Sequence, residues 1–253
     1  DGNSIYDDAG NATLSTQTTG TKYLPDETAP VISNISDGAA TYVKQGDNVT
    51  IIFSVVEEKA LNTDPTVTIT TSGDATISTM NSADDAPNGS GTYGDPYVYT
   101  YTYSVPAGDY TDVKIKVDAT DDASNAATQA VETAAFTIDN TLPEVSSIVK
   151  QSPTWQQTNE TNVTWRVTFN ENINAGTLAN TDFTVTGDVD VAPTIGAPSE
   201  QTATTVYDVT VTGIDVDGTG DPRESLRLDF TGSVDDLAAN SSTAQYTSGE
   251  TYI

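Results

Sequence analysis

Cysteine and histidine are both absent from this chain of 253 residues. Without cysteine, no disulfide framework can hold the fold together. Without histidine, the chain lacks the most common general base, the most common metal-binding side chain and a group that titrates near neutral pH. Ser-His-Asp and Cys-His catalysis within the chain are therefore excluded.

Basic residues are also few. The chain has 9 Lys and Arg against 37 Asp and Glu, which gives a formal net charge of −28. Nucleic acid binding needs Lys and Arg to neutralise phosphates, and no basic stripe is present, so we exclude nucleic acid as a partner. The same charge argues against docking on an anionic membrane surface. Self-repulsion of this size destabilises a compact state, and divalent cations are the natural means of offsetting it.

Long apolar runs are missing as well. No run approaches the roughly 20 residues that a membrane-spanning helix needs, so no direct membrane insertion is expected. No segment shows a sustained 3.6-residue period with helix caps. The chain instead consists of short Thr- and Val-rich segments bounded by Gly, Pro, Asp or Asn, which predicts strands. Alternation is clearest in two segments, with the predicted core faces Val49, Ile51, Phe53, Val55 and Val163, Trp165, Val167, Phe169.

Internal repeats organise these strands. An acidic turn occurs in residues 4–13, 120–128 and 233–242, and we align its copies at Asp8, Asp122 and Asp236. An Asp-x-Thr-x-Pro segment follows the first two turns, as "DETAP" (26–30) and "DNTLP" (139–143). The segments "TGTKYL" (19–24) and "SGETYI" (248–253) form a third pair.

The repeats predict an all-β chain of tandem immunoglobulin-like β-sandwich domains, because their period of about 114 residues suits such a domain. Residues 26–138 and 139–253 are each predicted to form one sandwich. Residues 1–25 are predicted to be the C-terminal tail strand of a preceding domain, or a strand exchanged between subunits.

The chain also resembles a known family. Residues 144–253 resemble the Ig-like repeats of large bacterial surface proteins and adhesins, through "VTWRVTFNENI", "DFTVTG", "YDVTVTG" and "LRLDFTGSVDDLAAN". Residues 26–140 resemble a related repeat, through "GDNVTIIFSVVEE" and "VDATDDASNAA". Cadherin ectodomains, whose acidic linkers are rigidified by calcium, show a similar logic.

The resemblance implies an extracellular, cell-surface structural protein of a bacterium or archaeon, not an enzyme. It implies a calcium-stiffened adhesin stalk, or alternatively a subunit of a filament or surface layer (S-layer) assembled by strand exchange or head-to-tail contacts. The implied partners are neighbouring Ig-like domains or copies of the same chain.

The acidic turns and linkers are candidate Ca²⁺ sites, because Ca²⁺ prefers carboxylate and carbonyl oxygens and closely set carboxylates repel without a cation. A strand-end Glu follows each alternating strand, with Glu58 as an adjacent possibility in the first. The predicted ligands are Asp7, Asp8, Asn11, Asp26, Glu57, Asp118, Asp121, Asp122, Asn125, Asp139, Glu171, Asp235 and Asp236.

Two geometries stay open for these ligands. In one, the turn at Asp121, the linker residue Asp139 and the strand-end Glu171 converge at the domain junction. In the other, the acidic turn lies a strand length from that linker and holds a site within one domain. A third interpretation is a turn without metal, since Asp and Asn favour turns for backbone reasons.

A second acidic loop is "DVDGTGDPRE" (215–224). Asp215, Asp217 and Asp221 resemble part of a calcium loop, but Thr219 and Leu226 replace two ligands of the EF-hand pattern. A hairpin turn is the favoured interpretation.

Aromatic residues raise a third function, a carbohydrate- or protein-binding module that contacts surface glycans. Tyr97, Tyr99, Tyr101 and Tyr103 share one face of a strand, which is either exposed for such contacts or packed in the sandwich. Trp155 is predicted in a loop. Paired carboxylates can hydrolyse glycosides, but here they fall on turns and linkers, so no catalytic residue is assigned.

Overall fold

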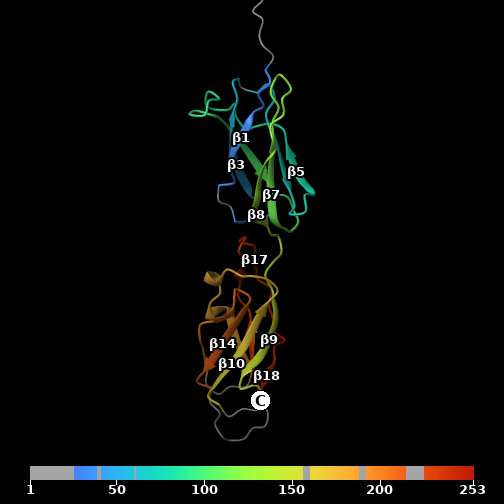
Figure 1. The fold of residues 1–253 in the computed structure, drawn as a ribbon. Coiled ribbons are helices and arrows are strands. Elements are labelled where there is room, and N and C mark those ends of the chain that lie inside the picture. Colours follow the sequence, from blue (N-terminus) through green and yellow to red (C-terminus); the bar gives the residue numbers. More distant parts are fainter. Residues whose placement is uncertain (1–25, 39–40, 60, 156–159, 188–191, 215–224) are drawn as a thin grey trace, which may run out of the picture.

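The computed structural model describes residues 26–38, 41–59, 61–155, 160–187, 192–214 and 225–253. The described chain is built of strands and two three-residue 3₁₀ helices, Ala175–Thr177 and Asn180–Asp182, which confirms the predicted all-β class. Within these residues no helix has the length or apolar character to cross a membrane. Two separate groups of β-sheets follow one another along the long axis of the molecule (Figure 1). We call residues 26–138 the first unit and residues 139–253 the second unit.

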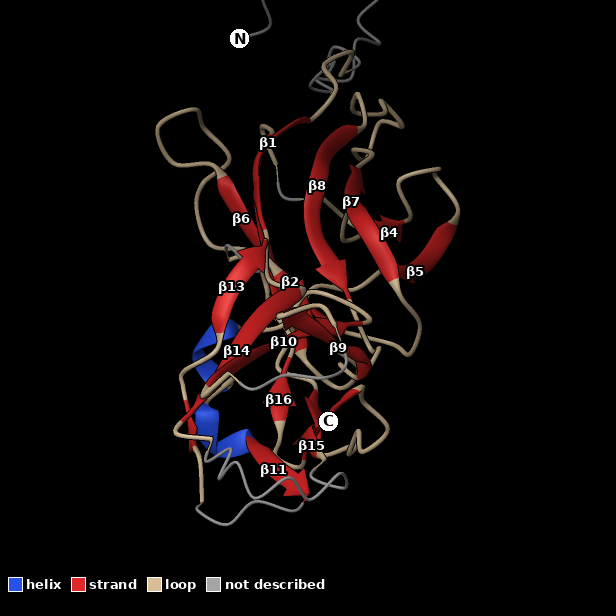
Figure 2. Ribbon diagram, turned by 90° about the horizontal axis from the view of Figure 1, so that it is seen from below, coloured by secondary structure: helices blue, strands red, loops and turns tan. Residues whose placement is uncertain are grey.

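The first unit has two sheets that enclose one core. A three-stranded antiparallel sheet has the order β1-β3-β6, and a five-stranded sheet has the order β2-β8-β7-β4-β5. Figure 2 shows β8, β7, β4 and β5 side by side. Among the described strands of this unit, β2 and β8 are the one parallel pair. The strands are β1 (Val31–Ser36), β2 (Tyr42–Val43), β3 (Asn48–Val56), β4 (Thr66–Thr70), β5 (Thr76–Met80), β6 (Tyr97–Ser104), β7 (Tyr110–Asp118) and β8 (Ala130–Ile138).

The second unit has a separate core between two larger sheets. One sheet has the order β12-β14-β10-β9 with β13 beside β14, and the other has the order β11-β15-β18. A small sheet, β16-β17, adjoins the end that faces the first unit (Figure 1). The strands are β9 (Val145–Ser152), β10 (Asn162–Phe169), β11 (Phe183–Gly187), β12 (Thr194–Ile195), β13 (Ser199–Thr202), β14 (Val206–Thr212), β15 (Leu226–Phe230), β16 (Val234–Asp235), β17 (Ser241–Ser242) and β18 (Thr251–Tyr252).

Alternation of apolar residues decides which strand faces lie inside. All eight residues of the two predicted core faces, in β3 and β10, are buried. Trp165 is fully buried and meets the ring of Tyr252 edge-on, with centroids 4.9 Å apart. Its indole Nε1 donates a hydrogen bond to the Glu250 carbonyl at 2.9 Å. The segment "SGETYI" therefore closes the core of the second unit.

The tyrosine row of β6 belongs to the core of the first unit. Tyr99, Tyr101 and Tyr103 are each 1% exposed, and Phe53 stacks on the first two rings. The Tyr101 hydroxyl donates to the Pro65 carbonyl. This row therefore offers no exposed platform for a sugar ring, whereas Trp155 is 63% exposed.

Candidate metal centres

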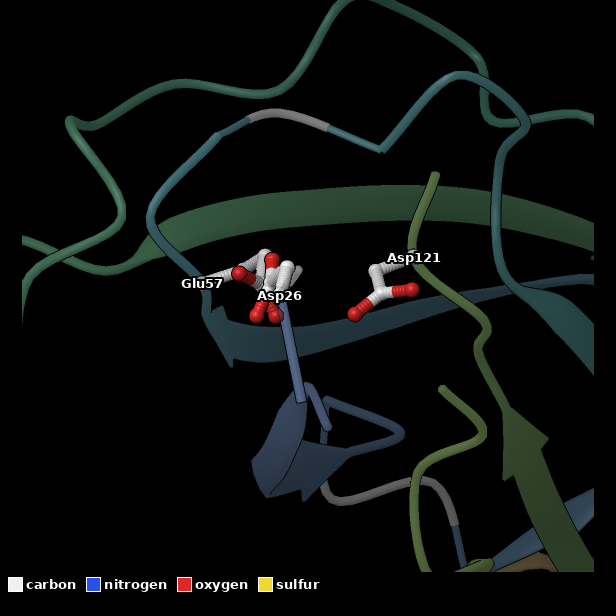
Figure 3. A group of neighbouring side chains, drawn as sticks. All are labelled: Asp26, Glu57 and Asp121. Atoms are coloured by element: carbon white, nitrogen blue, oxygen red, sulfur yellow. The ribbon is translucent and has the colours of Figure 1, made fainter. Parts of the chain in front are cut away.

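Three carboxylates meet at one end of the first unit, which we call its head. Asp26 precedes β1, Glu57 follows β3 and Asp121 lies in the turn after β7 (Figure 3). One oxygen from each side chain lies within 4.8 Å of the other two. We call Asp26, Glu57 and Asp121 the head trio.

The second unit carries an equivalent group where it meets the first. Asp139 precedes β9, Glu171 follows β10 and Asp236 lies in the turn after β16. These three side chains also offer oxygens within 4.8 Å of one another. We call Asp139, Glu171 and Asp236 the junction trio. Both trios thus combine a linker Asp, a strand-end Glu and a turn Asp.

An asparagine four residues after the turn Asp shapes each turn. Asp121 accepts hydrogen bonds from the Asn125 backbone N–H and from Asn125 Nδ2, both at 2.8 Å. Asn125 Nδ2 also donates to the Asp26 carbonyl at 3.0 Å. The amide thereby fixes the turn carboxylate and ties the turn to the linker. Asn125, predicted as a ligand, thus has a positioning role through its amide nitrogen.

Asn240 repeats this arrangement in the second unit, although sequence reasoning did not assign it a role. Its backbone N–H and Nδ2 donate to Asp236, both at 2.7 Å, and Nδ2 also donates to the Asp139 carbonyl at 2.8 Å. The signal that would have revealed Asn240 is the Asp-x₃-Asn spacing shared with Asp121 and Asn125.

This spacing corrects the alignment of the repeats. Asp236 corresponds to Asp121, because each carboxylate accepts two hydrogen bonds from the Asn four residues later. The sequence alignment paired Asp236 with Asp122, one residue out of step, because it matched the second acidic residue of each copy. Asp122 lines the cavity beside the head trio but is not one of the three clustered carboxylates.

Two further predicted ligands lie outside the trios. The carboxylate of Asp118 accepts two hydrogen bonds from Gln129 Nε2, at 2.8 and 3.0 Å. Asp235 accepts one from the Ser241 hydroxyl. The remaining predicted ligands, Asp7, Asp8 and Asn11, lie outside the described residues, as do Asp215, Asp217 and Asp221 of the second acidic loop.

The trios also correct the expected partners at the junction. Of the two geometries left open by the sequence, the one in which the turn at Asp121 meets Asp139 and Glu171 is wrong, and the turn instead lies a strand length from that linker, as in the other. The nine residues of β8 separate that turn from Asp139, a length of roughly 30 Å. The linker Asp of each trio instead meets the turn of the unit that follows it, so Asp139 meets Asp236.

The electrostatics of the head trio centre on Glu57, which is 7% exposed. Its Oε1 accepts a hydrogen bond from the Glu58 N–H at 2.8 Å, while its buried Oε2 has no hydrogen-bond partner within the described structure. Burial, followed by the charges of Asp26 and Asp121, raises the pKa of Glu57. Burial also acts to raise the pKa of Asp121, but the hydrogen bonds from Asn125 and from the Ala123 and Ser124 backbone together outweigh it and lower that pKa.

In the junction trio, burial and like charge have a larger effect on the pKa of the strand-end Glu. Burial and the charges of Asp139, Asp236 and Asp109 raise the pKa of Glu171 to about 7. Burial also raises the pKa of Asp139. The buried Oε1 of Glu171 has no hydrogen-bond partner among the described groups. Each trio therefore includes a buried strand-end carboxylate oxygen that has no hydrogen-bond donor among the described groups and that suits a bound cation.

The chemistry of both trios suits a hard divalent cation. A cavity of about 210 Å³ adjoins the head trio, lined by Asp26, Glu57, Lys59, Leu61, Asp121, Asp122 and Ala123. Ca²⁺ takes six to eight oxygen ligands, and three carboxylates with nearby carbonyls and water can supply them. Soft metals are poorly matched, because they prefer sulfur or imidazole and the chain has neither cysteine nor histidine.

Comparison with protein-family models gives no match, and no curated protein sequence matches the chain significantly.

Proposed function

We propose that the chain is part of an extracellular cell-surface protein, a stalk of tandem immunoglobulin-like sandwiches that bind Ca²⁺ at the head of each unit. The observation that carries this proposal is the buried, unpartnered carboxylate oxygen of Glu57 inside a cluster of three carboxylates. A carboxylate in that state is costly unless a cation pairs with it. The equivalent oxygen of Glu171 in the second cluster supports the same function.

The role of the cation is structural. Ca²⁺ in each trio would offset the mutual repulsion of the carboxylates and join the linker, a strand end and a turn. Because it binds the folded state, it stabilises that state by about 2.7 kcal/mol at a hundredfold excess over its Kd. No chemical step is assigned to the site, and we infer no enzymatic activity.

Thermal unfolding of the whole chain with Ca²⁺ and with EDTA tests the proposal. We expect Ca²⁺ to raise the Tm by roughly 10 °C, given that free-energy gain and units of this size. Asp118→Asn is the matched control, because it removes a carboxylate outside both trios and should leave the Ca²⁺-dependent shift intact. Identical melting curves with Ca²⁺ and EDTA would show that the proposal is wrong.

A further inference from the structure

Asp139, the first residue of the second unit, makes hydrogen bonds to both units. Its backbone N–H donates to the Val43 carbonyl at 2.9 Å, as the last step of the β2–β8 ladder in the first unit. Its carbonyl accepts from Asn240 Nδ2 in the second unit. Its carboxylate lies in the junction trio. No free linker residue therefore separates the last ladder bond of the first unit from the candidate metal centre of the second.

The next residue, Asn140, makes its hydrogen bonds to the first unit within the described structure. Its backbone N–H donates to Asp109 Oδ1, its Nδ2 donates to the Gly108 carbonyl, and its Oδ1 accepts from the Gln45 N–H, each at 2.6 Å. The Thr141 hydroxyl donates to Asp109 Oδ2 at 3.2 Å. We call these contacts of Asn140 and Thr141 the clasp.

The clasp and the junction trio use different side chains. All three carboxylates of the trio lie at residue 139 or beyond. The first-unit carboxylate that acts on them, Asp109, has both oxygens bonded to the clasp. It influences the trio through its charge, as one of the causes that raise the pKa of Glu171. The first unit thus holds the linker beside the centre and adds no carboxylate to the trio.

We propose that this junction is a joint with two separable latches that share Asp139. One latch is the clasp, which fixes the linker to the first unit without metal. The other is a cation in the junction trio, which fixes Asp139 to the second unit. The proposal rests on the calcium site proposed above, and it makes the cation stiffen the joint with no side-chain ligand from the first unit.

Distances between spin labels in the full chain measure the joint directly. Because the chain has no cysteine, the exposed pair Ser72→Cys and Ser199→Cys gives one labelled site in each unit. We expect a narrow distance distribution with Ca²⁺ and a broader one with EDTA. Glu171→Gln should weaken Ca²⁺ binding at the junction by about tenfold or more and broaden the distribution even with Ca²⁺.

Asn140→Ala separates the two latches. It should broaden the distribution in Ca²⁺ while changing the junction Kd, from calorimetry, by less than about threefold, because it removes no carboxylate of the trio. Glu57→Gln is the matched control: it removes a strand-end carboxylate at the far end of the first unit and should leave the distribution unchanged.

The outcomes distinguish the two proposals. If the unaltered chain binds no Ca²⁺, the proposed function fails. If the chain binds Ca²⁺ but Asn140→Ala abolishes binding at the junction, the clasp is part of the metal site and the two-latch joint is wrong. If the distance distribution of Asn140→Ala stays narrow in Ca²⁺, the two-latch joint is also wrong, because the clasp then does not restrain the linker.

Discussion

The head trio and the junction trio contain equivalent carboxylates but differ in their surroundings. At the junction, Asp236 is 1% exposed and Asn240 is 8% exposed, whereas Asp121 and Asn125 are only partly buried. The clasp and a hydrogen bond from Lys44 Nζ to the Ala239 carbonyl cover the junction. Among the described residues, no group from a preceding unit covers the head trio.

Each unit therefore carries its own candidate site, and the joint is an addition to it. The trio and its Asn recur with matching hydrogen bonds in both units, although within the described part of the chain another unit lies against the junction trio alone. The clasp, in contrast, depends on Asn140, and Glu27 occupies the equivalent position beside the head trio. A carboxylate there cannot donate a hydrogen bond to a carbonyl as Asn140 Nδ2 does.

The largest expected difference between the two units follows removal of the positioning asparagines, Asn240 in the second unit and Asn125 in the first. Asn240→Ala removes Nδ2, the donor to one oxygen of Asp236 and to the Asp139 carbonyl, while the backbone N–H bond to the other Asp236 oxygen remains. The loss should cost the second unit about 1–3 kcal/mol. Loss of such an orienting partner typically lowers metal affinity by about 10- to 100-fold. Asn125→Ala should cost less, because its turn is more exposed. Urea unfolding and calorimetry of both variants check this order, and equal losses would contradict it.

The next largest effect should be a pH dependence of the stability of the second unit in the absence of calcium. Glu171 has a folded pKa of about 7, above its ordinary value of 4.5. A raised carboxyl pKa means that the folded state holds the proton longer, so stability falls as the pH rises from about 4.5 to 7. In EDTA, the free energy of unfolding of the second unit should therefore fall across this range.

Glu171→Gln removes the titrating group and should flatten that fall. Glu57→Gln should leave it in place in the second unit, because its carboxylate belongs to the head trio. Urea titrations at pH 5 and pH 7.5 measure the effect. A profile that Glu171→Gln does not change would show that another group is responsible.

Much of the fold was predictable from local pattern. Alternation in 48–56 and 162–170 correctly placed Phe53 and Trp165 in the core, because a strand with one buried face leaves a period of two. The parity of the β6 tyrosines was equally clear, but parity alone does not say which face of a strand is covered. That depends on the second sheet, whose position no local pattern reports.

The candidate sites were predictable as residue types but not as groups. All six carboxylates of the two trios were named from the sequence, since linker, strand end and turn each repeat. Which turn meets which linker depends on the direction of β8, and that is a property of the whole sheet. The clasp was missed entirely, because Gln45, Gly108 and Asp109 contact Asn140 from loops far away in the sequence.

Exchanging the residues that follow the linker Asp should have a moderate, one-sided effect. Asn140→Glu places a carboxylate against Asp109 and the Gly108 carbonyl, so it should open the clasp and destabilise the joint by about 1–3 kcal/mol. Glu27→Asn is the reciprocal change and should be within about 0.5 kcal/mol of neutral, as for an ordinary surface site. Spin-label distances and chemical unfolding of the two variants test this, and a comparable loss in Glu27→Asn would mean that the heads are more alike than their contacts indicate.

The smallest expected effect is that of Lys44→Ala. The Lys44 ammonium donates to the Ala239 carbonyl across the joint, but it is an exposed contact on a long, flexible side chain. Such contacts contribute about 0–1 kcal/mol, because water competes for both partners and ordering the side chain costs entropy. The variant should therefore keep the Tm, the Ca²⁺ affinity and nearly the whole width of the distance distribution. If Lys44→Ala instead broadened the distribution as much as Asn140→Ala does, the joint would depend on the Lys44 ammonium group. The clasp would then not be the contact that fixes the linker without metal.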